Sequence, residues 1–129
     1  MKILAFEVRD DEKKGLMETA QELGVELELS SEVPCMENVE LVNGFEGVSI
    51  LGQGDINSEL LSAWKKQGVD YVSTRTIGYN HIDVENARKI GIRVCNARYA
   101  PNGVADFTVM LMLMCLRNYK QALWRGQVN

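Results

Sequence analysis

Short apolar segments alternate with helix-like segments along this chain, at a spacing of about 20–25 residues that is typical of repeated strand–helix units. Strands are predicted at residues 3–8, 25–29, 48–51, 69–73 and 92–95, with helices between them. This alternation indicates a parallel sheet with helices on both faces. Five strands suit the flavodoxin-like order 2-1-3-4-5, so we predict an α/β fold of that type.

Residues that begin and end helices support this division. Residues 10–23 carry apolar side chains on one helical face, and Gly24 ends that helix. Asn57 or Ser58 is predicted to cap a second helix, and Asp83 to cap a third.

The last part of the chain has a different pattern. Pro101 is predicted to precede one long helix that extends to Arg125. Residues 104–116 are apolar nearly all around the helix axis, so this helix must be covered on more than one side, by another domain or another subunit. The apolar stretch contains Asp106 and is shorter than the roughly 20 residues that cross a bilayer. Its methionines are predicted to be packing residues rather than metal ligands.

Composition excludes several classes of function. A net charge of −4 over 129 residues, without a run of Lys or Arg, argues against nucleic acid as a partner. The first apolar stretch is interrupted by Glu7 and Arg9 too soon for a signal peptide. The three cysteines are far apart, and two lie in apolar segments, so we predict reduced core thiols and a cytoplasmic location. No His/Cys/Asp cluster has the spacing of a metal site.

A glycine turn follows the fourth predicted strand. The strand leads to Gly78, and Asp83 then opens a helix, so free backbone N–H groups and the positive end of a helix dipole lie close together. This arrangement suits a small carboxylate; the alternative is a structural turn in which Gly78 takes a positive φ. Ligands of such sheets bind at the carboxyl ends of the strands, where Gln53 is also expected.

Three blocks of the sequence, residues 3–13, 74–83 and 99–106, resemble the D-2-hydroxyacid dehydrogenases, especially the D-lactate dehydrogenases of the vancomycin-resistance type. The resemblance implies that residues 1–100 form a flavodoxin-like substrate domain. It also implies that residues 101–129 form an interdomain and dimerisation helix leading to a separate Rossmann domain that binds NAD. In that family the cofactor fingerprint and the catalytic Arg, Glu and His lie beyond this helix. The 129-residue chain alone is therefore expected to be inactive, with no catalytic residue of its own.

The resemblance also implies site residues. The N–H groups of Ile77 and Gly78 would hold the substrate carboxylate, and Tyr99 would close the cleft at the interdomain hinge. Gln53 is a candidate for the cleft lining, and Val104 for a cofactor contact.

Three other features are given different interpretations. His81 lies in the turn and not where the family has its catalytic histidine, so it is predicted to be a surface turn residue. Arg75 either faces the substrate or pairs with a nearby acid. The segment Gly52-Gln53-Gly54 covers only part of a G-x-G-x-x-G motif, and Asn57 stands where the third glycine belongs, so nucleotide binding there is not predicted.

The expected function is the substrate-domain part of an NAD-dependent oxidoreductase that reduces a small 2-oxo acid to a 2-hydroxy acid. We expect a homodimer formed through residues 101–125. Two alternatives stay open: a stand-alone flavodoxin-like module that binds a carboxylate or regulates without catalysis, and an enzyme remnant with only a structural role.

Overall fold

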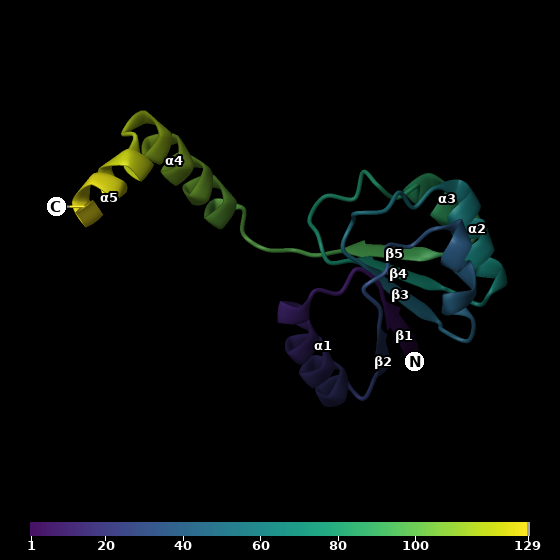
Figure 1. Cartoon of the computed structure of the whole chain (residues 1–129). Coiled ribbons are helices and arrows are strands. Elements are labelled where there is room, and N and C mark those ends of the chain that lie inside the picture. Colours follow the sequence, from purple (N-terminus) through teal and green to yellow (C-terminus); the bar gives the residue numbers. More distant parts are fainter. Residues whose placement is uncertain (129) are drawn as a thin grey trace. The chain divides into compact units, whose positions relative to one another are not determined.

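The computed structural model describes residues 1–128. The chain divides into two compact units, Met1–Arg98 and Tyr99–Asn129. The first unit contains the sheet, and the second contains two helices (Figure 1). The strands are β1 (Lys2–Ala5), β2 (Glu26–Leu29), β3 (Gly47–Ile50), β4 (Tyr71–Thr74) and β5 (Arg93–Asn96).

The sheet has the order β2-β1-β3-β4-β5, and every neighbouring pair is parallel. Ser49 pairs with Ala5 on one side and with Ser73 on the other, and Ser73 pairs with Cys95. The carboxyl ends of β1, β3, β4 and β5 therefore meet at one edge. This confirms the predicted flavodoxin-like order, and each connection between successive strands contains a helix, as parallel connections usually do.

The helices of residues 58–66 and 84–89 lie on one face of the sheet (Figure 1), and their buried side chains form the hydrophobic core together with those of the strands. The ring of Trp64 stacks on that of Phe6 with centroids 6.2 Å apart. Asn57 caps one helix of this layer by accepting the Leu60 N–H at 3.0 Å, as predicted. The helices of the first unit are α1 (Asp10–Leu23), the 3-10 helix η1 (Met36–Val42), α2 (Ser58–Lys66) and α3 (Val84–Lys89).

The opposite face of the sheet is covered only in part. Helix α1 lies on this side, across a groove of about 900 Å³ that Ile3 and Leu16 help to line. Tyr71, Arg93 and Cys95, on β4 and β5, remain exposed there. Helices are therefore present on both faces of the sheet, as predicted, but in the first unit this face has only α1.

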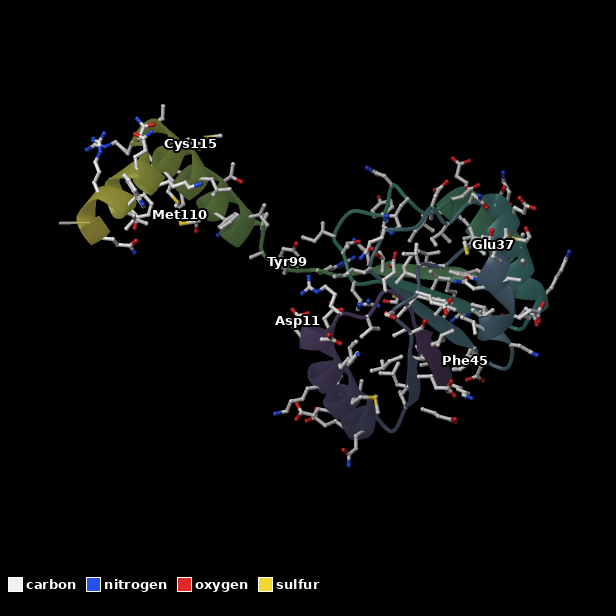
Figure 2. All side chains as sticks on the ribbon, viewed as in Figure 1. Asp11, Glu37, Phe45, Tyr99, Met110 and Cys115 are labelled. Atoms are coloured by element: carbon white, nitrogen blue, oxygen red, sulfur yellow. The ribbon has the colours of Figure 1, made fainter. Side chains whose placement is uncertain are left out.

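The prediction of core thiols is wrong. Cys35, Cys95 and Cys115 are all exposed and free. Cys95 belongs to an apolar segment, but alternate residues of a strand point to opposite faces, and its side chain lies on the sparsely covered one. Cys115 lies on a helix whose large apolar side chains are themselves exposed (Figure 2).

The second unit contains α4 (Asn102–Leu116) and α5 (Tyr119–Val128) rather than the single long helix that we predicted. The break lies at Asn118, whose φ of 49° is left-handed. Asparagine takes this conformation more readily than most residues, so a short polar segment ends α4 where apolar periodicity alone showed no boundary. Among residues 1–128, no helix is long and apolar enough to cross a membrane.

Candidate carboxylate-binding site

The candidate site lies where β1, β3 and β4 end. The loop after β3 comprises residues 51–54, and the turn after β4 comprises residues 75–78. Because β3 and β4 are paired in register up to Ile50 and Thr74, these two loops leave the same edge of the sheet side by side. This is the edge at which ligands of doubly wound sheets bind.

The turn after β4 is held by its own side chains. The Thr74 and Thr76 hydroxyls lie 2.7 Å apart, and the Thr76 hydroxyl donates to the Gly78 carbonyl at 2.7 Å. The Asn96 amide donates to the Ile77 carbonyl at 2.8 Å. The carbonyl oxygens of Ile77 and Gly78 are therefore occupied, which leaves the N–H groups of these two residues as their available backbone polar atoms.

Ile77 and Gly78 present such N–H groups. Neither donates a hydrogen bond to any residue in the described part of the chain, and both residues are exposed. Gly78 does not have a positive φ, and a Cβ added to it would meet nothing within 4 Å. Its turn therefore does not need a glycine for backbone or packing reasons, which favours close approach of a ligand over the structural alternative.

Arg75 pairs within the protein. Its guanidinium donates to the Phe6 carbonyl at 2.8 Å and to the Ser49 hydroxyl at 3.0 Å, and it lies 3.7 Å from the Glu12 carboxylate. Burial lowers the pKa of Arg75, whereas the carboxylates of Glu12 and Glu7 raise it. Of the two interpretations of Arg75, pairing with a nearby acid is the one observed.

Glu7 is the residue that sequence reasoning missed. It follows β1 and is buried, and its carboxylate accepts N–H groups from four consecutive residues, 51–54. The available signal was a glutamate inside an otherwise apolar predicted strand, residues 3–8. Such a residue must be paired if it is buried. The sequence did not reveal the partner, which lies more than forty residues away.

Gln53 and His81 lie at the same edge. Gln53 is exposed at the loop after β3. His81 is half-buried, with its ring so close to Gly52 that a Cβ there would lie 3.0 Å from the ring carbon Cε1. Its backbone carbonyl also accepts the Ile56 N–H at 2.7 Å. His81 therefore packs against the loop, whereas we predicted a surface residue.

The remaining sequence predictions have different outcomes. Asp83 caps α3 by accepting the Asn86 N–H at 3.0 Å, as predicted. Tyr99 and Val104 belong to the second unit, where both are exposed, and their roles stay predictions (Figure 2). No group of three or more His, Cys, Asp or Glu side chains suited to a metal ion occurs within residues 1–128.

The segment Gly52-Gln53-Gly54 does not fit a nucleotide. The backbone N–H groups that would have to hold a phosphate already donate to the Glu7 carboxylate. A second anion at this position would also be repelled by that carboxylate. The structure thus gives a physical reason against nucleotide binding at this loop.

Residues 3–123 match the family described as D-isomer specific 2-hydroxyacid dehydrogenase, catalytic domain. An aromatic 2-oxoacid reductase from Clostridium sporogenes is 38% identical over 130 residues, which cover 100% of this chain and 39% of that protein. A D-specific alpha-keto acid dehydrogenase from Enterococcus faecium is 48% identical over 73 residues, 57% of this chain and 23% of that protein.

Solved structures agree with this match. The apo form of D-lactate dehydrogenase from Escherichia coli superposes with a TM-score of 0.85 at 28% identity, covering 97% of this chain and 40% of that one. The chain therefore spans only about two fifths of the relatives it matches. Sequence match, sheet order and fold together place the chain in the family of D-isomer specific 2-hydroxyacid dehydrogenases, as part of their catalytic domain.

Proposed function

We propose that this chain forms the substrate-domain part of an NAD-dependent D-2-hydroxyacid dehydrogenase that reduces a small 2-oxo acid, with D-lactate as a typical product. The observation that carries the proposal is the pair of N–H groups at Ile77 and Gly78. They have no acceptor among residues 1–128 and lie at the ligand-binding edge of a sheet whose family acts on 2-hydroxy acids.

In this proposal the chain binds and orients the substrate. The N–H groups of Ile77 and Gly78 donate to the carboxylate, and the Thr76 and Asn96 side chains keep the turn in shape by engaging its carbonyls. Fixing the carboxylate leaves the neighbouring 2-oxo group in one orientation, which is an entropic contribution to catalysis. Gln53 lines the same site, and Tyr99 covers it.

NAD would be bound mainly outside this chain. No strand–Gly-x-Gly-x-x-Gly–helix unit occurs within residues 1–128, and the Gly52-Gln53-Gly54 loop does not fit a phosphate. When bound, the cofactor supplies the hydride that reduces the 2-oxo carbon. We propose the division inferred from the sequence: a substrate domain at 1–100, and a segment at 101–129 that leads to the cofactor domain and brings Val104 to the cofactor.

We further propose that α4 mediates homodimerisation in a cytoplasmic enzyme. Support comes from the large apolar side chains of α4, of which Phe107, Leu113 and Leu116 are 57%, 56% and 77% exposed. Burying such side chains is favourable, so α4 offers a surface for a second subunit.

The carboxylate site can be tested by NMR on the 129-residue chain with sodium pyruvate as the probe. We expect pyruvate to shift the amide resonances of Ile77 and Gly78, and acetone, which lacks the carboxylate, to leave them unchanged. Gly78→Ala should abolish the response, because the added methyl group occupies open space above the turn.

Gly15→Ala is the matched control for this experiment. Gly15 also has no neighbour within 4 Å of an added Cβ, but it lies on α1 and belongs to neither of the two loops that form the site. The control should respond to pyruvate as the wild type does. Equal responses in Gly78→Ala and the wild type would contradict the assignment. Pyruvate binding without activity after the cofactor domain is restored would favour the non-catalytic binding module.

A further inference from the structure

The buried carboxylate of Glu7 has no role in the function proposed so far. Glu7 is 3% exposed at the end of β1, and its φ of 57° is left-handed, which is uncommon for a residue with a side chain. A buried carboxylate needs compensating hydrogen bonds, because burial removes its hydration. The bonds that Glu7 makes therefore indicate what it does.

Four backbone donors converge on this carboxylate. Oε2 accepts the N–H groups of Leu51 and Gly52, the latter at 2.7 Å. Oε1 accepts those of Gln53 and Gly54 at 2.7 and 2.9 Å. Consecutive N–H groups that point to one place form an anion-binding concavity. The concavity in this loop is filled by a side chain of the protein itself.

Arg75 also contacts Glu7, through the backbone of Glu7. One guanidinium nitrogen, Nη2, donates to the backbone carbonyls of Phe6 at 2.8 Å and of Glu7 at 3.3 Å. The turn that contains Ile77 and Gly78 begins at Arg75. The ends of three strands are thus joined: β1 through Glu7, β3 through residues 51–54, and β4 through Arg75.

The two loops at this edge differ in their free donors. In residues 51–54 all four N–H groups are engaged by Glu7, whereas those of Ile77 and Gly78 have no acceptor in the described chain. A substrate carboxylate would therefore be directed to the β4 turn, and the β3 loop would contribute side chains such as Gln53.

We propose that Glu7 is a positioning residue: its carboxylate fixes residues 51–54, and this loop in turn places Gln53 beside the 2-oxo acid. Glu7 does not touch the substrate. The inference rests on the function proposed above. It differs from that proposal in assigning a role to Glu7, which follows β1 and holds the loop of residues 51–54.

The first test measures hydrogen exchange on the 129-residue chain without any 2-oxo acid. In the wild type, the amide protons of Gly52, Gln53 and Gly54 should exchange much more slowly than those of Ile77 and Gly78. Glu7→Gln turns one acceptor into a donor that faces N–H groups. We expect exchange at residues 52–54 to accelerate by about tenfold to a hundredfold, the range for losing a hydrogen bond to a charged group.

Glu37→Gln is the matched control. This substitution makes the same chemical change as Glu7→Gln, but on an exposed carboxylate of η1 (Figure 2). It should leave exchange at residues 52–54 unchanged.

The second test is chemical rescue in Glu7→Ala with sodium formate. Removing the side chain leaves four N–H groups around an empty space that formerly held a carboxylate. Formate should shift the amide resonances of Gly52, Gln53 and Gly54 back toward their wild-type positions. Formate should have no effect on these resonances in the wild type, where Glu7 occupies the concavity.

The third test separates positioning from mere stability. Pyruvate affinity, read from the Ile77 and Gly78 resonances without formate, should fall by about tenfold in Glu7→Ala, whereas Glu37→Gln should bind as the wild type does. Unchanged affinity in a folded Glu7→Ala variant would overturn the positioning role. So would rapid wild-type exchange at residues 52–54.

The remaining outcomes are also decisive. Unfolding of both Glu7 variants, with Glu37→Gln folded, would assign Glu7 to the stability of the sheet and overturn the positioning role. A wild type that does not respond to pyruvate would instead contradict the proposed function. The exchange and formate measurements contain no 2-oxo acid, so the two failures are distinguishable.

Discussion

Replacing Arg75 by methionine should destabilise the first unit by about 3–5 kcal/mol, in the range for losing two hydrogen bonds to a charged group. Methionine keeps an apolar stem of similar length, so the lost interactions are chiefly those of the guanidinium. The two shortest are hydrogen bonds to the Phe6 carbonyl and the Ser49 hydroxyl; the guanidinium also donates to the Glu7 carbonyl at 3.3 Å and lies 3.7 Å from the Glu12 carboxylate. Each bond to a charged group contributes about 1.5–3 kcal/mol, and the abandoned carbonyl remains buried without a donor.

Urea unfolding followed by tryptophan fluorescence measures this change. A Trp124→Phe background makes the signal report on Trp64, which is buried in the core of the first unit. Arg88→Met is the matched control, because Arg88 is an exposed arginine on α3. The control should differ from the wild type by less than about 0.5 kcal/mol, as surface substitutions usually do.

The test of this prediction is the difference in unfolding free energy between Arg75→Met and Arg88→Met. A difference in unfolding free energy below about 1 kcal/mol would refute the argument that Arg75 joins the strand ends, because even one lost bond should exceed it. Loss of any cooperative transition in Arg75→Met alone would mean that the cost exceeds the total stability, and would agree with the argument.

Three further results are expected. Fluorescence titration of the 129-residue chain with NADH should show no saturable binding. Residues 1–128 contain no strand–Gly-x-Gly-x-x-Gly–helix unit, and the N–H groups of Gly52, Gln53 and Gly54 already donate to Glu7. Saturation at micromolar NADH would contradict this. Sedimentation at micromolar concentration should show a dimer or larger species. The double substitution Leu111→Glu with Met114→Glu should weaken this association, since a charge in an apolar interface is costly. A monomeric wild type would exclude α4 as the interface. The hydrogen bond from Arg9 lowers the pKa of Asp11. The contact between the two side chains should therefore be intact near neutral pH and be lost as the pH falls through the lowered pKa of Asp11. Carboxyl NMR of Asp11 should show Arg9→Met returning its pKa toward the ordinary value near 3.8; an unchanged value would show that the contact is absent in solution.

Local features of the sequence were sufficient for the elements and their order. Alternating strands and helices predicted the parallel sheet, and Asn57 and Asp83 cap helices as expected. Capping depends on a side chain and an N–H group three residues away, so a single sequence contains the necessary information. The glycine turn at Gly78 was found for a similar reason, since strand, turn and helix follow one another directly.

Predictions that depended on what covers a surface were less successful. The apolar surroundings of Cys95 suggested a core thiol, but its strand turns this side chain toward the face where only α1 provides cover. The apolar periodicity of residues 102–125 also concealed the break at Asn118. Periodicity reports the hydrophobic character of a segment but not the single backbone angle that divides it.

The sequence by itself determined the α/β fold, the positions of its turns and the family resemblance, because these depend on residues close together in the chain. Only the tertiary structure decided what Glu7 and Arg75 do. Glu7 meets donors 44–47 residues away, and Arg75 reaches backbone carbonyls 68 and 69 residues away. Buried charges are stable only with partners, and the parallel sheet supplies those partners by bringing distant strand ends to one edge.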